Sequence, residues 1–321
     1  DTVAYASTRL ADDIEMLIAA ADAEFAIVQH HPAFLGSHQL SKLVDLLVVC
    51  AGLPTAIVVH ALSNEQIPLL KRLSEFRAII VSHKREDLLT LSAQGLDALQ
   101  LPLAIPSLPQ RARKTSLRAG SDFTIASNGF LREHKGIEVI VDAFALLRQS
   151  LPEARLNLHC PLYPSEDSER ACAAVIEAIA RHQLEAVVKL DTAYKDKQTL
   201  LEDLSDADVA VFAYGESAEG GSAAAADAVG AGLPVIVSPS RIFDDLRETA
   251  LTCRGDAESI AAALRDVHSD PTLYRKLAIQ SQTYADRNSW ELVVDTLSGA
   301  LLSSVGNRRA DAAAPGVTVD A

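Results

Sequence analysis

The sequence predicts an α/β protein that contains two doubly wound, Rossmann-like units. Short apolar segments rich in β-branched residues alternate with helical patterns along most of the 321 residues, and this alternation is typical of helices packed on parallel strands. A Pro-rich and basic segment interrupts the alternation, which indicates a boundary between two domains. A chain of this length can form two domains with a sizeable core in each.

The amino-terminal domain is predicted to span residues 1–110. A helical pattern at residues 10–21 opens it, and apolar runs that are too short for helices follow. These runs are expected to form parallel strands at residues 25–29, 55–59, 78–82 and 99–105.

A linker is predicted at residues 111–120. Several prolines precede a group of cations, and together these residues are Pro102, Pro106, Pro109, Arg111, Arg113, Lys114 and Arg118. The ordinary interpretation is a solvated linker, and the alternative is contact with anionic lipid, because clustered cations are attracted to such a surface.

The carboxyl-terminal domain is predicted at residues 121–287. Strands are expected at 123–127, 156–159, 187–190, 209–214 and 235–237, and helices at 137–149, 257–267 and 271–287. A last helix is expected at 288–303, because Trp290 and Leu297 belong to an apolar stripe. Residues 304–321 lack periodicity and are predicted to form a disordered tail.

Composition limits the function classes. The formal charge of −14 argues against a nucleic-acid-binding protein. The four cysteines are far apart and are expected to be free thiols in a reducing compartment. No apolar run approaches the roughly 20 residues that span a bilayer, and no signal peptide is recognisable. The sequence therefore predicts a cytoplasmic protein, with peripheral contact at the inner membrane face as the alternative that the basic linker leaves open.

Residues 209–239 form the most informative segment. An apolar run predicts a strand, residues 215–221 form a Gly-rich loop with Glu216 and Glu219, and an alanine-rich helix follows. Ser222 is expected to cap that helix at its start, where backbone N–H groups form an anion site. A carboxylate beside them is suited to accept hydrogen bonds from sugar hydroxyls.

A second candidate element, residues 128–136, lies between the first strand and first helix of the carboxyl-terminal domain. Its glycines, Gly129 and Gly136, permit a turn that places Arg132 and Lys135 at a helix start. Such a turn can hold a diphosphate. The alternative is that both charges are simply solvated.

Histidines follow three strands of the amino-terminal domain. His30 follows the first predicted strand, His60 the second and His83 the third, at the sheet edge where open α/β sheets bind ligands. His30 is the preferred candidate, although each of them could be a structural histidine. The cluster has no spacing that indicates a metal site. Asp244 and Asp245 are interpreted as caps of a following helix.

These motifs resemble one known family. Glu219 and Asp227, separated by seven residues and followed by Gly-Leu-Pro, resemble the signature of retaining glycosyltransferases with the GT-B fold, which usually has Glu at both positions. The pattern Gly-Phe-Leu…His-Lys-Gly in residues 129–136 is similar to family 4-like enzymes of bacterial surface-polysaccharide synthesis. Phe130 stands where that family often has Arg.

The resemblance implies two Rossmann-like domains facing a cleft, with the amino-terminal domain shortened, because nothing before residue 10 resembles the family's Gly-rich loop. It implies that Glu219 orients the donor sugar and that His30 supports it from across the cleft. The donor-binding residues implied are Gly129, Arg132, Lys135, Gly220, Gly221, Ser222 and Asp227.

The implied substrates are a GDP- or UDP-linked sugar and a glycan or lipid-linked acceptor, with no cofactor and no metal. A catalytically inactive binding module or a segment of a larger enzyme is the main alternative, and a GT-B epimerase is a third. In the GT-B fold the last helix commonly packs on the first domain, so Trp290→Ala is expected to cost about 3–5 kcal/mol. Packing of Trp290 wholly within the second domain is the alternative.

Overall fold

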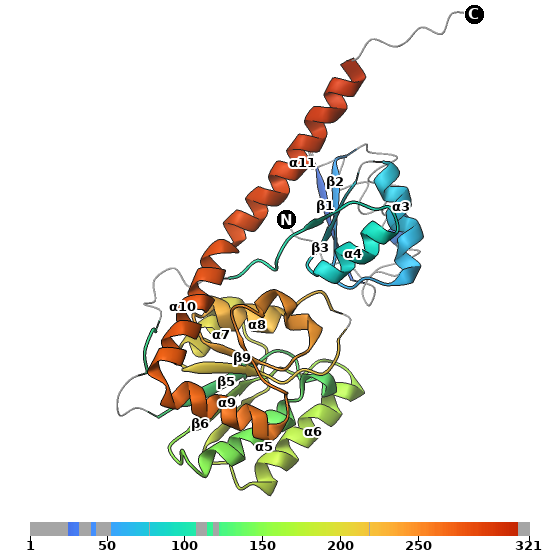
Figure 1. The fold of residues 1–321 in the computed structure, drawn as a ribbon. Coiled ribbons are helices and arrows are strands. Elements are labelled where there is room, and N and C mark those ends of the chain that lie inside the picture. The colour runs from blue at the N-terminus through green and yellow to red at the C-terminus, as the bar shows by residue number, and fades with distance from the viewer. Residues whose placement is uncertain are drawn as a thin grey trace, which may run out of the picture. The chain divides into compact units, whose positions relative to one another are not determined.

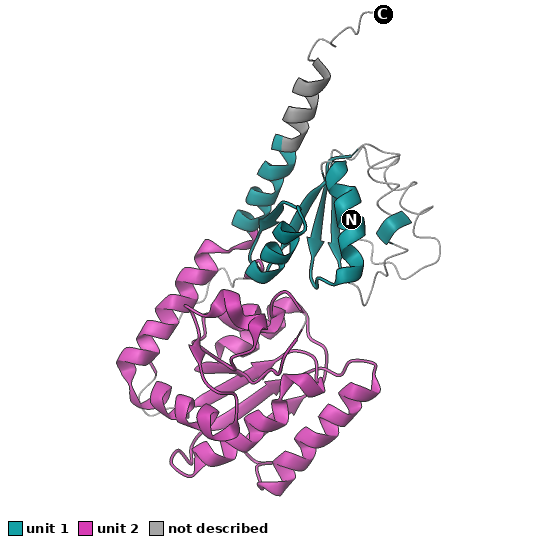
Figure 2. Ribbon diagram, turned by 45° about the vertical axis from the view of Figure 1, so that its right-hand side comes forward, with its two compact units in different colours: residues 1–102, 291–321 teal, residues 103–290 magenta. Residues whose placement is uncertain are grey.

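The computed structural model describes residues 25–31, 40–42, 53–76, 78–106, 114–117, 122–217 and 219–313, with side chains up to residue 303. It divides into two compact units, Asp1–Pro102 with Glu291–Ala321 and Leu103–Trp290 (Figure 2). The helix predicted at residues 10–21 lies outside the described residues, as do Cys50, Arg111, Arg113 and Arg118.

The first unit contains a four-stranded parallel sheet in the order β1-β2-β3-β4 (Figure 1). Helices α3 and α4 contribute to the core on one face of it, where Leu70 and Leu91 are fully buried against Ile57 and Ile80. Its elements are β1 (Ala26–His30), β2 (Thr55–Val59), η2 (Asn64–Gln66), α3 (Ile67–Glu75), β3 (Ile79–Ser82), α4 (Arg85–Ala93) and β4 (Ala98–Gln100).

The other face of this sheet packs against the last helix, α11 (Trp290–Ala313). Leu297 and Leu301 of α11 form one apolar cluster with Ala56, Val58 and Val81. Side chains alternate between the two faces of a strand, so β2 contributes Ile57 to one core and its neighbours to the other.

Two predictions about the last helix are corrected. Trp290 is 57% exposed, so it is not the buried anchor that the sequence suggested. The helix also continues to Ala313, so residues 304–313 are helical and do not belong to the predicted tail. Their composition, rich in Ala and Arg, suits a helix without the apolar stripe on which the boundary at 303 was based.

The second unit contains a six-stranded parallel sheet in the order β10-β9-β8-β5-β6-β7. This is a doubly wound order, in which the chain direction across the sheet reverses between β5 and β8. Its elements are β5 (Thr124–Asn128), η3 (Glu133–Lys135), α5 (Ile137–Arg148), β6 (Arg155–His159), α6 (Glu166–Arg181), β7 (Val188–Asp191), α7 (Lys197–Ser205), β8 (Val209–Phe212), α8 (Ala223–Gly230), β9 (Val235–Val237), η4 (Arg241–Leu246), β10 (Leu251–Thr252), α9 (Ala257–Ser269) and α10 (Pro271–Arg287).

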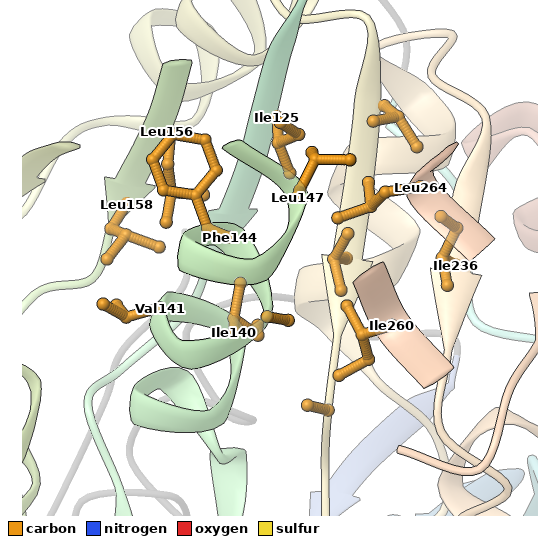
Figure 3. Packing of buried hydrophobic residues seen from close by; sticks show 14 of the residues in the cluster. Ile125, Ile140, Val141, Phe144, Leu147, Leu156, Leu158, Ile236, Ile260 and Leu264 are labelled. Atoms are coloured by element: carbon orange, nitrogen blue, oxygen red, sulfur yellow. The ribbon is translucent and has the colours of Figure 1, made fainter. Parts of the chain in front are cut away.

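Alternation along these strands forms two cores. Ile125 of β5 belongs to the larger cluster, with Phe144 of α5 and Leu264 of α9 (Figure 3). Its neighbour Ala126 points to the opposite face, where α8 contributes Val229. The strand segments predicted from apolar runs therefore become the buried sheet, with their carboxyl ends at a common edge.

Some elements differ from the prediction. The strand expected at 99–105 ends at Gln100, and Ile105 instead donates its N–H to the Asn288 carbonyl oxygen at 2.8 Å. The helices α6 and α7 were not predicted. Both begin at strong caps, because the side chains of Ser165 and Asp196 accept backbone N–H groups three residues later.

Candidate functional site

The loops that follow β5 and β8 meet at the carboxyl edge of the second unit's sheet. Gly215 donates its N–H to the carbonyl oxygen of His134 at 2.8 Å, which ties the two loops together. Strands β5 and β8 are neighbours in the sheet and lie where its order reverses. Open α/β sheets bind ligands at such a switch point.

Glycines allow the two loops to approach closely. Gly129 has a φ of 109°, and a Cβ there would lie 3.0 Å from the Cβ of Ala224 on α8. Gly136 has a φ of 59°, and its Cβ would lie only 2.4 Å from the carbonyl oxygen of Ala213. The backbone turn after β5 therefore lies directly beside the start of α8.

Lys135 and Glu219 converge at this place. The Lys135 ammonium lies 3.9 Å from the centre of the Tyr214 ring, which is a cation–π contact. Burial lowers the pKa of Lys135, and the nearby charge of Glu219 partly offsets that effect. The half-buried cation and the carboxylate thus interact electrostatically across the two loops.

The loop at residues 215–221 leads into α8 as the sequence predicted. The hydroxyl oxygen of Ser222 accepts the N–H of Ala225 at 3.2 Å and caps the helix. Gly220 and Ser222 are buried, and Gly221 is partly exposed. The helix therefore begins beside Glu219 with its first N–H groups in the loop.

Arg132 already forms an ion pair. Its guanidinium pairs with the carboxylate of Asp167 on α6, and it also lies 5.3 Å from the centre of the Tyr163 ring. Hydrogen bonding to Arg132 lowers the pKa of Asp167. Of the two predicted cations in this turn, only Lys135 has no carboxylate in direct contact among the described residues.

Asp227 has a partner that the sequence analysis missed. Both oxygens of this carboxylate, which is 8% exposed, accept from the ammonium of Lys197 at 2.6 and 2.7 Å. Burial raises the pKa of Asp227, and Lys197 opposes the rise. Lys197 is the first residue of α7, directly after its cap, and no sequence pattern links it to α8.

This pair gives a testable stability prediction. Lys197→Met leaves a buried carboxylate unpaired, so the variant should lose about 1–3 kcal/mol of unfolding free energy at pH 8. That is less than for a fully buried pair, because the Lys197 side chain is 55% exposed. The loss should shrink at pH 5, since a carboxyl with a raised pKa binds a proton in the folded state and the charge disappears.

Urea denaturation at both pH values measures the effect. Lys189→Met is the matched control, because it removes an exposed lysine from β7 of the same unit. Lys197→Arg should stay close to wild type, since it keeps the charge. Equal losses for Lys197→Met and Lys189→Met would contradict the prediction.

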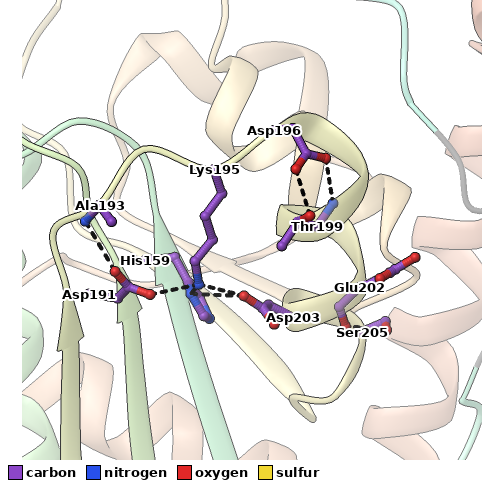
Figure 4. Close-up of polar contacts among 9 residues, drawn as sticks. All are labelled: His159, Asp191, Ala193, Lys195, Asp196, Thr199, Glu202, Asp203 and Ser205. Atoms are coloured by element: carbon purple, nitrogen blue, oxygen red, sulfur yellow. Dashed lines mark hydrogen bonds and ion pairs between the residues drawn. The ribbon is translucent and has the colours of Figure 1, made fainter.

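A second polar network lies at the ends of β6 and β7 (Figure 4). The Lys195 ammonium donates to His159 Nδ1 at 3.1 Å, to Asp191 at 2.7 Å and to Asp203 at 2.5 Å. Burial lowers the pKa of His159, and Lys195 lowers it further. The imidazole proton must therefore be on Nε2, which is buried without a partner among the described residues.

Asn128 adds to this set of unpaired groups. It lies opposite His159 in the β5–β6 register, and both polar atoms of its buried amide lack a partner among the described residues. The sequence analysis gave neither side chain a role, because His159 was the last position of a predicted strand and Asn128 the first position of the element at 128–136. Buried polar atoms of this kind are normally satisfied by a ligand or by ordered water.

The first unit presents its own polar edge. His30 ends β1 and is 1% exposed, and its Nε2 lies 2.6 Å from the amide nitrogen of Gln66. The His60 and His83 rings lie 5.1 Å apart, and His83 Nδ1 donates to the Leu101 carbonyl oxygen at 2.8 Å. Burial lowers the pKa of His60 to about 4, so this ring is neutral near pH 7.

The interpretation of Asp244 and Asp245 as helix caps is wrong. Both lie inside η4, which begins after Ser240, and Asp244 pairs with Arg247. Burial raises the pKa of Asp245 to about 6, and the Tyr284 hydroxyl donates to it at 3.3 Å. A Cβ on Gly221 would lie 4.0 Å from the Asp245 carboxylate, so this acid borders the loop before α8.

Of the cations in the predicted linker, Lys114 lies among the described residues. Its ammonium donates to the carbonyl oxygens of Asp206 and Ala207 and pairs with Asp208 at 3.4 Å. This lysine is therefore held by the second unit.

None of the helices within the described ranges is long and apolar enough to cross a membrane. Within the same ranges, no group of three or more His, Cys, Asp or Glu residues is placed to hold a metal ion.

Residues 122–270 match the family model described as "Glycosyl transferases group 1". The second unit contains a glycosyltransferase domain. The match covers both loops of the candidate site, and it confirms the glycosyltransferase prediction for this domain. Among curated proteins no match was found.

Solved structures resemble the glycosyltransferase domain together with the rest of the chain. An α,α-trehalose 6-phosphate synthase from Burkholderia multivorans is 14% identical with a TM-score of 0.70, covering 94% of this chain and 76% of its own. Anabaena HepE, in complex with UDP and glucose, is 15% identical with a TM-score of 0.68, covering 92% and 81%.

The pneumococcal O-GlcNAc transferase GtfA, in complex with UDP and GlcNAc, is also similar. It is 15% identical with a TM-score of 0.67, and the match covers 91% of this chain and 60% of GtfA. At these identities the similarity concerns the fold alone. The GT-B type of α/β fold, predicted from the sequence, is confirmed.

Proposed function

We propose that this protein transfers a sugar, with retention of configuration, from a GDP- or UDP-linked donor to a glycan or lipid-linked acceptor in surface-polysaccharide synthesis. One observation carries the proposal. In a domain that matches group 1 glycosyltransferases, Lys135 and Glu219 converge from two loops beside the start of α8. A cation, a carboxylate and free helix N–H groups are the parts that a nucleotide sugar requires.

The roles of the residues follow from their chemistry. Lys135 and the backbone N–H groups at Gly220–Ser222 stabilise the diphosphate as its bond to the anomeric carbon breaks and the electron pair leaves with its oxygen. Glu219 accepts hydrogen bonds from sugar hydroxyls. The acceptor hydroxyl oxygen then bonds to the anomeric carbon on the same face, and its proton passes to the departing diphosphate oxygen.

Other predicted site residues have supporting roles in this proposal. Asp227 contacts the ribose together with Lys197, which shares its carboxylate. Gly129 lets the backbone approach α8, and Arg132 lies at the rim, paired with Asp167. For His30, the family resemblance implies a hydrogen bond to the sugar. In the proposal the enzyme needs no metal or other cofactor, because cations and helix N–H groups take the developing charge.

The proposed setting is the cytoplasm, with peripheral access to a lipid-linked acceptor at the inner membrane face. Free thiols support a reducing compartment, since Cys160, Cys172 and Cys253 form no disulfide. Lys114 is held by carbonyl oxygens and Asp208, so it does not support membrane contact through the linker.

Nucleotide release from a panel of GDP- and UDP-sugars tests the proposal. Glu219→Ala and Lys135→Ala should each lower the rate with the best donor about 100-fold or more, as expected when a charge-stabilising group is removed. Glu216→Ala and Lys189→Ala are matched controls at exposed positions of the same unit and should stay near wild type. Equal rates in wild type and in both site variants would refute the assignment.

Calorimetry with the same panel separates the alternative classes. Donor binding without turnover would indicate a catalytically inactive module or a segment that needs a larger enzyme. Conversion of the donor sugar in the absence of any acceptor would indicate an epimerase. If no nucleotide sugar in the panel bound, all of these proposed functions would be contradicted.

A further inference from the structure

Segment 103–106, the first four residues of the second unit, contacts both ends of α8. A Cβ at Gly221, in the loop before the helix, would lie 2.8 Å from Leu103 Cδ1 and 3.2 Å from Leu103 Cγ. A Cβ at Gly230, the last residue of the helix, would lie 1.9 Å from the Pro106 carbonyl oxygen. A larger residue at either position would force one of the two partners to move, so the close packing of this segment accounts for both glycines.

Segment 103–106 is fixed to the second unit at Ile105. This residue is buried in the core cluster that contains Val229 of α8. Its N–H donates to the carbonyl oxygen of Asn288, directly after α10, at 2.8 Å. Ile105 also precedes a proline, which restricts its backbone to the extended conformation. Burial, a hydrogen bond and a restricted backbone therefore hold the segment in place beside α8.

Gly221 has a second neighbour, the Asp245 carboxylate, which lies 4.0 Å from the same Cβ position. The Tyr284 hydroxyl of α10 donates to this carboxylate at 3.3 Å, and the Tyr284 carbonyl oxygen accepts from the Asn288 side-chain amide at 2.9 Å. Asn288 is the residue that holds Ile105. The end of α10 therefore supports both segment 103–106 and Asp245.

The position of Gly221 affects the start of α8. Gly221 precedes Ser222, whose hydroxyl oxygen accepts the N–H of Ala225 at 3.2 Å. The first N–H groups of a helix have no partner within the helix and can bind an anion. A shift of the Gly221 backbone would therefore move Ser222 and change the direction of these N–H groups.

We propose that Leu103 is a positioning residue, which holds the backbone at Gly220–Ser222 so that the N–H groups at the start of α8 are aligned for the diphosphate of the donor. This inference rests on the proposed function for its ligand. A leucine suits the role, because its side chain has no hydrogen-bonding atom and leaves the N–H groups available to the ligand. Every contact in this argument lies within the second unit.

The first measurement is the affinity of the full chain for UDP and for GDP, by calorimetry. Leu103→Ala should weaken binding of the tighter of the two about tenfold, the effect of losing one hydrogen bond to a charged group. Leu103→Met conserves the side-chain volume and should stay near wild type. Leu151→Ala is the matched control, because it truncates another partly buried leucine, which packs on the opposite core, and it should leave the affinity unchanged.

The second measurement is a double-mutant cycle between Leu103 and Gly221. Gly221 has no positive φ, so the methyl group of Gly221→Ala acts through its contacts alone. This variant should also weaken nucleotide binding about tenfold, because the loop or Leu103 must move. Combined with Leu103→Ala it should add little, since the methyl group then has space. Independent effects would instead multiply to about 100-fold.

The third measurement needs no ligand. Hydrogen exchange at the Ala225 amide reports whether the Ser222 cap is closed, because the first turn of a helix exchanges by local opening. Leu103→Ala should raise this exchange rate about tenfold, and Leu151→Ala should not. Melting temperatures separate these effects from loss of folding, and Leu103→Val takes the place of Leu103→Ala if that variant does not fold.

Wild-type affinity and wild-type exchange at Ala225 in Leu103→Ala would overturn the inference. A 100-fold loss of affinity in the double variant would also overturn it, since Leu103 and Gly221 would then act independently. If neither UDP nor GDP bound to wild type, the proposed function would be refuted. The exchange rate at Ala225 would still decide whether Leu103 holds the start of α8.

Discussion

Gly136→Ala is expected to lower the free energy of unfolding of the second unit by about 3 kcal/mol or more. Gly136 has a φ of 59°, which costs an L-residue about 1–2 kcal/mol. Its Cβ would also lie 2.4 Å from the Ala213 carbonyl oxygen, so one of the two loops must move. Overpacking of this kind adds about 1–3 kcal/mol. Urea denaturation measures the change.

Two other glycines distinguish the backbone cost of a positive φ from the cost of overpacking. Gly95 has a φ of 75° with nothing within 4 Å of its Cβ position, so Gly95→Ala reports the backbone cost alone. Gly299 has open space and no positive φ, so Gly299→Ala should be neutral or slightly stabilising in its helix. If Gly136→Ala cost no more than Gly95→Ala, the close approach of the two loops would be wrong. Donor binding should weaken in Gly136→Ala, since Lys135 is its neighbour.

The sequence was most informative where local pattern decides the structure. The apolar run at Val209 and the cap at Ser222 predicted β8, α8 and their loop, and Ser222 does cap that helix. Each signal depends on neighbours along the chain. The order of the six-stranded sheet then follows from general rules for βα units.

Long-range pairing of polar side chains could not be predicted in this way. Lys197 reaches Asp227 across 30 positions, and Gln66 reaches His30 across 36. A lysine or glutamine has no periodic pattern that indicates its partner, and on a helix each resembles a solvated residue. The caps at Ser165 and Asp196 were within reach of sequence rules, because a capping residue before a helical pattern is a local signal.

In the last helix, burial determines which side chain stabilises the packing on the sheet. A tryptophan in an apolar stripe suggested a large buried area, but Trp290 is 57% exposed and Leu301 is fully buried. Trp290 lies at the start of α11, before the turns that pack on the sheet. Leu301 contacts the cluster that contains Val58 and Val81. The apolar stripe was identified from the sequence, but its centre was placed too early.

Leu301→Ala is therefore expected to lower the unfolding free energy of the first unit by about 2–5 kcal/mol, since it removes a fully buried side chain and leaves a cavity. Trp290→Ala should cost less than about 1 kcal/mol. Leu302→Ala is the matched control, because Leu302 is the adjacent residue and is 58% exposed. Amide hydrogen exchange at Val58 and Val81 locates the loss in the first sheet. Equal effects of Leu301→Ala and Leu302→Ala would show that α11 does not stabilise that sheet through this face.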